Sequence, residues 1–160
     1  VWGQMKIQRC WFHKMGNVLD KMPDCVQSAA KKKLQDIFLA DTKQHAQDAY
    51  KHFIDTYELK YPKATECLSK DYDDLFRFYD YPAEHWVHIR TSNPIESMFA
   101  TVRLRHRSTK GNGSADATLT MVFKLCKEAE KNWRRLKGFE KLQLVKEDKT
   151  FVDGILQIAA

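Results

Sequence analysis

The sequence lacks the hydrophobic segments that membrane insertion and secretion require. No apolar run approaches the roughly 20 residues of a membrane-spanning helix, and no charged segment followed by an apolar one stands at the start, as it would in a signal peptide. The 160 residues, 43% of them hydrophobic and 30% charged, are enough for one well-buried core. We therefore expect a cytoplasmic protein that makes no membrane contact.

Paired cysteine spacings are also missing. The four cysteines are scattered, which excludes a recognisable disulfide framework and fits a reducing compartment: Cys10, Cys25, Cys67 and Cys126. Cys10 and His13 have a C-x-x-H spacing that could form half of a zinc site. No second pair completes the four ligands that a structural zinc site usually needs, so a structural role near a strand end is favoured.

Acidic residues are scarce between residues 90 and 110, where Glu96 stands alone. Five basic residues share this stretch: Arg90, Arg103, Arg105, Arg107 and Lys110. The whole chain has 27 Lys and Arg against 21 Asp and Glu, a net charge of +6. The local excess of positive charge favours a polyanion as partner.

The same stretch predicts a helix that begins at Pro94. Asn93 can cap it with its side-chain oxygen, and Pro94 suits the first helical position, where its missing N–H costs nothing. Apolar residues then recur at i, i+3, i+4 and i+7 and predict a buried side: Ile95, Met98, Phe99 and Val102. At about 100° per residue, Glu96, Arg103 and Arg107 form a second stripe beside it.

Glu96 has two competing interpretations. With Asn93 as the cap, Glu96 can reach back to the cap's backbone N–H and meets the positive end of the helix dipole. Alternatively, it is a metal-binding carboxylate on a surface that attracts phosphates. The local pattern alone favours capping, and a side chain folded onto its own backbone does not point at a metal.

The rest of the chain is predicted to be mainly helical. Met5 to Phe12 is the best strand candidate, although no partner strand is visible. The pattern further predicts a helix over 13–21 and two helices within 25–60, the second of which begins with a capping box at Asp41 and Gln44. Short helices are predicted to begin at Pro62 and at Asp71, and an irregular connector follows over 82–89. A long helix over 115–136, terminated by Gly138, and a mixed tail complete the chain.

Several motifs resemble the C-terminal half of Mutator-type bacterial insertion-sequence transposases. They are Arg90-Thr91-Ser92-Asn93-Pro94-Ile95-Glu96-Ser97, Phe99-Ala100-Thr101-Val102-Arg103, Lys110-Gly111, Met121-Val122-Phe123-Lys124-Leu125 and Trp133-Arg134-Arg135-Leu136. Gln8 to Lys14 resembles the Cys/Asp-x-x-His signature of that family, with Cys10 and His13 at the signature positions. The resemblance covers nearly the whole chain and weakens in the last twenty residues.

This resemblance implies a fold and a metal site. The fold class is mainly α: the C-terminal part of a ribonuclease-H-like core with an all-helical insertion. Residues 1–13 would be a remnant strand, 14–88 the insertion, 89–138 the catalytic-Glu helix and the following core helix, and 139–160 a tail. Two aspartates and one glutamate bind two Mg²⁺ ions in this family; the glutamate corresponds to Glu96, and a basic residue seven positions later to Arg103.

The implied function is that of a DDE transposase, which performs metal-dependent DNA cleavage and strand transfer as a homo-oligomer on transposon ends and target DNA, near the nucleoid. The family's two aspartates belong upstream of Cys10, so we expect these 160 residues alone to be inactive. The DNA-binding residues we predict are Arg90, Asn93, Arg103, Arg105, Arg107 and Lys110. The alternative is a non-catalytic remnant that binds DNA or a transposase subunit, in which Arg134 and Arg135 also contact phosphates. A third hypothesis is a helical protein whose basic helix is merely exposed.

Overall fold

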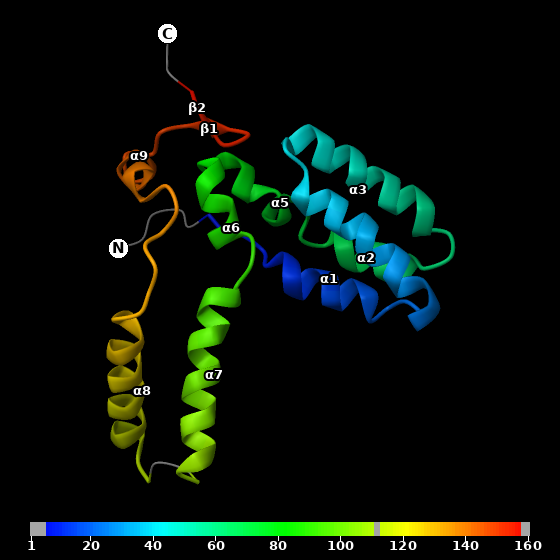
Figure 1. Ribbon diagram of the computed structural model, residues 1–160. Helices are drawn as coiled ribbons and strands as arrows, with labels where there is room; N and C mark the ends of the chain where they lie inside the picture. The colour runs from blue at the N-terminus through cyan, green and yellow to red at the C-terminus, as the bar shows by residue number, and fades with distance from the viewer. Residues whose placement is uncertain (1–5, 111–112, 158–160) are drawn as a thin grey trace. The chain divides into compact units, whose positions relative to one another are not determined.

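The structure, a computed structural model, describes residues 6–110 and 113–157, without the side chains of residues 93–95. Its regular elements are almost all helices, which confirms the predicted mainly α class (Figure 1). The chain divides into two compact units. We call residues 1–91 with 137–160 the scaffold unit, and residues 92–136 the hairpin unit. Each described helix is too short or too polar to cross a membrane.

The scaffold unit begins with a series of short helices, in the order that the sequence predicts. They are α1 (Trp11–Leu19), α2 (Asp24–Leu39), α3 (Lys43–Tyr57), α4 (Pro62–Ser69), α5 (Tyr72–Leu75) and α6 (Trp86–Ile89), with 3₁₀ turns η1 (Arg77–Asp80) and η2 (Ala83–His85) before α6. The predicted helical pair within residues 25–60 is confirmed as α2 and α3, which lie side by side (Figure 1). The connector over 82–89 is more regular than expected, because η2 and α6 form within it.

The cap of α3 differs from the predicted capping box. Asp41 lies outside the helix, and Thr42 is the N-cap, where its hydroxyl accepts a hydrogen bond from the His45 N–H at 3.2 Å. A threonine oxygen satisfies one of the N–H groups that the first helical turn leaves without a partner. The N-cap therefore lies one residue later than the sequence suggested, and His45 stands where a capping box would need Glu or Gln.

The predicted strand over Met5 to Phe12 is wrong in its described part. Residues 6–10 have no regular structure, and Trp11 and Phe12 begin α1. The apolar residues Trp11, Met15 and Val18 recur at helical spacing and are buried together. Trp11 is fully buried, its indole N–H donates to Leu75 O at 2.8 Å, and its backbone N–H donates to Arg90 O at 2.9 Å. Met5 lies outside the described residues.

One core holds the helices of the scaffold unit together. Its largest fully buried side chains come from α1 to α5 and η1: Trp11, Leu34, Ile37, Phe53, Leu68, Leu75, Phe76, Phe78 and Tyr79. Burying an aliphatic or phenylalanine side chain of this size contributes about 1.5–3 kcal/mol. Burial raises the pKa of Tyr79, whose hydroxyl donates to Ala40 O at 2.8 Å.

The described residues of the tail pack on the rest of the scaffold unit. It contains η3 (Phe139–Lys141), α9 (Leu142–Lys146) and a two-stranded antiparallel hairpin of β1 (Phe151–Val152) and β2 (Ile155–Leu156). Phe151 pairs with Leu156 and is buried. The turn between the strands docks by its tip: Asp153 Oδ1 accepts from the Lys43 N–H at the start of α3, at 2.7 Å.

The hairpin unit consists of α7 (Asn93–Ser108) and α8 (Ala115–Glu130), two antiparallel helices that lie side by side (Figure 1). The helix α7 begins at Asn93, with Ser92 as its N-cap, one residue before the predicted start. The helix α8 ends at Glu130, six residues before the predicted end. Its last turn tightens through i→i+3 bonds from the Asn132 and Trp133 N–H groups, so Gly138 is not its terminator.

Candidate nucleic-acid interface

Glu96 lies in the first turn of α7 and is held by the residue that caps the helix. The Ser92 hydroxyl donates to Glu96 Oε1 at 2.5 Å, and the Glu96 backbone N–H donates to Ser92 O at 3.1 Å. The carboxylate is half-buried. This bond joins two side chains, whereas in the predicted capping box Glu96 accepts from the backbone N–H of the cap. The side chain of Asn93, the predicted cap, lies outside the described part.

The basic side chains that follow Glu96 are exposed. Arg103, Arg105, Arg107 and Lys110 all point to solvent, and within the described part of the chain none of them forms an ion pair. Arg103 and Arg107 come seven and eleven residues after Glu96, which places them within about 20° of it around the helix axis. These two arginines and the carboxylate therefore share one side of α7.

The acidic residues of α8 do little to neutralise these arginines. Lys127 pairs with Glu130 at 2.6 Å, and Lys131 with Glu128 at 2.5 Å, so two of its acids are matched within or beside the same helix. In the sequence, residues 92–136 contain nine Lys and Arg against four Asp and Glu, which is +5 of the chain's net +6. Nearly all of the excess positive charge belongs to the hairpin unit.

Arg90 is placed differently from the other predicted DNA-binding residues. It belongs to the scaffold unit, where its guanidinium donates to Phe38 O at 3.0 Å and lies 5.5 Å from the centre of the Phe38 ring. Burial lowers the pKa of Arg90. Any contact that Arg90 makes with DNA would have to use its remaining N–H donors.

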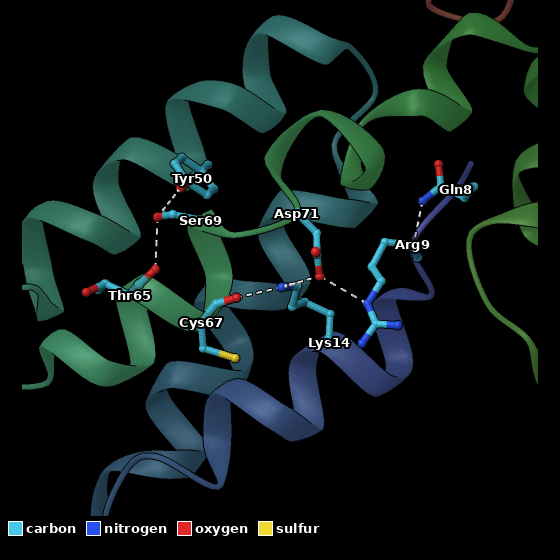
Figure 2. Close-up of polar contacts among 8 residues, drawn as sticks. All are labelled: Gln8, Arg9, Lys14, Tyr50, Thr65, Cys67, Ser69 and Asp71. Atoms are coloured by element: carbon cyan, nitrogen blue, oxygen red, sulfur yellow. Dashed lines mark hydrogen bonds and ion pairs between the residues drawn. The ribbon is translucent and has the colours of Figure 1, made fainter. Parts of the chain in front are cut away.

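The signature residues lie at the start of α1, where Cys10 is the N-cap and His13 is in the first turn. Their neighbours in the chain, Arg9 and Lys14, form an ion-pair network with Asp71 (Figure 2). Lys14 is almost fully buried; its ammonium group lies 2.7 Å from Asp71 Oδ2 and donates to Cys67 O at 2.5 Å. Arg9 pairs with the same Asp71 oxygen at 3.2 Å. The hydrogen bond from Lys14 is the main cause that lowers the pKa of the Asp71 carboxyl.

The pairing of Lys14 with Asp71 was not among the sequence-based predictions. Asp71 does stand at the predicted helix start, as the N-cap of α5, and its carboxylate also joins α1 to the chain just after α4. The sequence contains one weak signal of this ion pair: Lys14 lies on the apolar side of its helix, and a buried lysine needs an acidic partner inside the protein.

The described residues do not form a complete two-ion magnesium site by themselves. No group of three or more His, Cys, Asp or Glu side chains lies close enough together in residues 6–110 and 113–157 to hold a metal ion. Glu96 has the hard oxygen donors that Mg²⁺ prefers, but one carboxylate cannot complete its near-octahedral coordination. Cys10 and His13 likewise gain no further ligands from this part of the chain.

Comparison with known proteins agrees with these features. A family model described as "Transposase, Mutator family" matches residues 1–136, which include both the Cys10–His13 signature and the Glu96 helix. The chain belongs to the Mutator family of transposases. This Mutator-family chain is 47% identical over 148 residues to the transposase for insertion sequence element IST2 of Acidithiobacillus ferrooxidans. It is 45% identical over 156 residues to the transposase for insertion sequence element IS6120 of Mycolicibacterium smegmatis.

The two alignments cover most of this chain and about half of each relative. They include 92% and 98% of the Mutator-family chain, but only 50% and 48% of the relatives. The second alignment also takes in most of the tail, which lies beyond the residues matched by the family model. The chain thus spans about half the length of the curated relatives that it matches.

Proposed function

We propose that these residues are part of a DDE transposase, an enzyme that cuts and joins the DNA of an insertion sequence, and that Glu96 is one of its three catalytic carboxylates. The observation that carries the proposal is the position of Glu96. It stands in the first turn of α7, on the same side as the exposed Arg103 and Arg107, in the unit that holds most of the net positive charge.

The residues of α7 would divide the work between DNA binding and metal binding. Arg103 and Arg107 bind backbone phosphates, and Arg105 and Lys110 add to the field that attracts the DNA. The Ser92 hydroxyl donates to Glu96 Oε1 and so limits the rotation of the carboxylate. Glu96 thereby presents a negative charge within a positive surface, where a divalent cation can bridge protein and phosphate.

The metal would be Mg²⁺, held by Glu96 together with carboxylates from outside these 160 residues. Two bound ions would activate the attacking oxygen and stabilise the leaving oxygen in an in-line displacement at phosphorus. Because no three metal-binding side chains lie together in the described residues, we also propose that these residues are inactive without the rest of the protein.

The exposed apolar side chains of the hairpin unit support a place for it in a larger core. Phe99 on α7 is 51% exposed, and Leu119 and Phe123 on α8 are 67% and 64% exposed. Leu119 and Phe123 are four residues apart and therefore share one apolar side of α8. We infer that this apolar side belongs against the sheet of a ribonuclease-H-like core.

Substitution of Glu96 tests the catalytic proposal. In the whole protein as encoded, Glu96→Gln should abolish Mg²⁺-dependent cleavage of a duplex that carries the insertion sequence's own end, while binding to that duplex stays unchanged. Glu66→Gln is the matched control, because Glu66 is an exposed glutamate on α4. Cleavage by Glu96→Gln at the wild-type rate would refute the assignment.

The DNA-binding role of the arginines is tested by the salt dependence of affinity. Each phosphate contact contributes about 0.9 to the slope of log affinity against log salt. Arg103→Gln and Arg107→Gln should each lower the slope by about that amount, whereas Lys63→Gln, an exposed change in the scaffold unit, should leave it unaltered. Equal slopes for all the variants would place the DNA elsewhere.

A second candidate is a non-catalytic module that binds DNA or a transposase subunit. The observation in its favour is that the described residues hold no metal-binding cluster and expose apolar side chains on the hairpin unit. It predicts DNA binding that needs no metal and is indifferent to Glu96→Gln. Assembly into a homo-oligomer is a proposal under either candidate, and sedimentation of the whole protein with and without DNA tests it.

A further inference from the structure

Each of the two helices of the hairpin unit has a serine as its N-cap. Ser92 precedes α7 and Ser114 precedes α8. A serine at this position ordinarily has extended backbone, and its oxygen accepts from an N–H group that the first turn leaves without a partner. Ser114 behaves in this way: its φ is −138° and its ψ 164°, and its hydroxyl oxygen accepts from the Ala117 N–H at 3.1 Å. Ser114 is therefore an ordinary cap.

Ser92 uses its hydroxyl differently. Its φ of −89° and ψ of 6° lie in the bridge region, where many active-site residues are found, and not in the extended region. In the described part of the chain its side chain accepts no capping hydrogen bond from the first turn of α7. The hydroxyl donates to Glu96 Oε1 instead, at 2.5 Å. At this helix start the hydroxyl therefore holds a carboxylate and not a backbone N–H group.

Glu96 is held by Ser92 at both ends of its side chain. Its backbone N–H donates to Ser92 O at 3.1 Å, and its carboxylate accepts from the Ser92 hydroxyl. A glutamate in the first turn can otherwise fold back onto the N–H of the cap, where it does not point at a metal. The two bonds to Ser92 restrict the rotation of the bonds between them, so the carboxylate is oriented before any ligand arrives.

This bond is compatible with metal binding by Glu96. An ionised carboxylate has about four lone-pair sites, and the Ser92 hydroxyl occupies one of them. Carboxylates that bind a metal are commonly held by a hydrogen-bond donor behind them. Loss of such a donor typically lowers metal affinity or activity by about 10- to 100-fold.

We propose that Ser92 is a positioning residue for Glu96: its hydroxyl, which would otherwise cap α7, holds the Glu96 carboxylate in the orientation that binds a divalent cation. Ser92 acts only through Glu96 and makes no bond to the metal. The proposal rests on the proposed catalytic function of Glu96.

The experiment separates the hydroxyl from the cap. In the whole protein as encoded, Ser92→Ala removes both, whereas Ser92→Gly removes the hydroxyl but keeps a residue that caps helices almost as well as serine. Ser92→Thr keeps the hydroxyl. Ser114→Ala repeats the change at the ordinary cap of α8. The readouts are kcat and KM for Mg²⁺-dependent cleavage of the insertion sequence's own end. Electron paramagnetic resonance measures the affinity for Mn²⁺ without turnover, at the site that Glu96→Gln removes.

The expected result is a loss that follows the hydroxyl. Ser92→Ala and Ser92→Gly should each lower kcat and Mn²⁺ affinity by about 10- to 100-fold, while KM for DNA changes less than about two-fold. Ser92→Thr and Ser114→Ala should stay within about three-fold of wild type in both quantities. If Ser92→Ala fails to fold, Ser92→Gly still decides, because glycine at a cap costs little helix stability.

The results that would overturn the proposal have different causes. Wild-type kcat and Mn²⁺ affinity in Ser92→Gly would leave Ser92 only a capping role. Equal losses in Ser92→Gly and Ser92→Thr would show that the hydroxyl is not what matters. In both cases an inactive Glu96→Gln leaves the catalytic proposal standing. A fully active Glu96→Gln would refute the catalytic proposal and the positioning role together.

Discussion

The substitution Gly154→Ala, which adds a single methyl group, should detach the tail from the rest of the scaffold unit. Gly154 is at the tip of the β1–β2 turn with a φ of 79°. A Cβ built there would lie 2.6 Å from the Cβ of Ala83, 2.8 Å from its backbone N and 2.9 Å from its Cα. Backbone atoms cannot move aside as the end of a flexible side chain can, so Gly154→Ala forces the turn away from Ala83.

The cost follows from the strain and from the contacts that the turn makes. An L-residue in the left-handed region costs about 1–2 kcal/mol. Moving the turn also breaks three bonds: Gly154 N–H to Tyr79 O at 3.2 Å, Ala83 N–H to Gly154 O at 3.3 Å, and Lys43 N–H to Asp153 Oδ1 at 2.7 Å. At about 1 kcal/mol net for each bond, the total loss is roughly 4–5 kcal/mol.

Urea unfolding followed by tryptophan fluorescence measures this loss, because Trp11 is fully buried in the scaffold unit. Gly113→Ala is the matched control: Gly113 has a φ of 77°, but a Cβ there would meet nothing within 4 Å. It should cost only the backbone strain of about 1–2 kcal/mol. Adding Ala83→Gly to Gly154→Ala should restore stability only in part, since the backbone of residue 83 remains. A Gly154→Ala variant no less stable than Gly113→Ala would refute the reasoning.

Three further changes test the scaffold unit by urea unfolding. Gly16→Ala, at an exposed position of α1 where a Cβ meets nothing within 4 Å, should stabilise by up to about 1 kcal/mol; destabilisation would contradict the helix assignment. Thr42→Ala should cost about 1 kcal/mol, because the His45 N–H loses its acceptor; no change would argue against the cap. Asp71→Asn should cost about 1–3 kcal/mol at pH 7, because the almost fully buried ammonium group of Lys14 loses its charged partner and keeps only Cys67 O. Because the pKa of Asp71 is lowered in the fold, its contribution is complete above the unfolded pKa and is lost as the pH falls through the folded one. The difference between Asp71→Asn and wild type should therefore shrink toward pH 3, and a constant difference would contradict it.

Local sequence signals predicted the helices well where the chain supplies both a cap and an apolar side. The start of α4 at Pro62 follows from the fixed φ of proline at the first helical position. The strand assigned to Met5 to Phe12 failed because a short apolar run has no period long enough to separate strand from helix. The burial of Trp11 against Leu75 O and Arg90 O, residues far along the chain, is what selects the helix there.

The contacts that hold the tail could not be predicted in the same way. Asp153 and Lys43 are 110 residues apart, and a carboxylate that caps a distant helix leaves no spacing to recognise in the sequence. Asp153-Gly154 does indicate a turn, because glycine tolerates a positive φ. What the turn docks against depends on the close approach to Ala83, which only the folded chain defines.

The candidate site was predictable in its placement and less so in its detail. Glu96, Arg103 and Arg107 share a side of α7 as the helical period requires. From the sequence alone, capping and metal binding by Glu96 exclude each other, because a glutamate folded back onto its cap's N–H does not point at a metal. In the structure its Oε1 accepts from the Ser92 hydroxyl instead. An ionised carboxylate has about four lone-pair sites, so one such bond leaves acceptor capacity for a cation. The cap contact and the proposed metal role are therefore compatible in one conformation of Glu96.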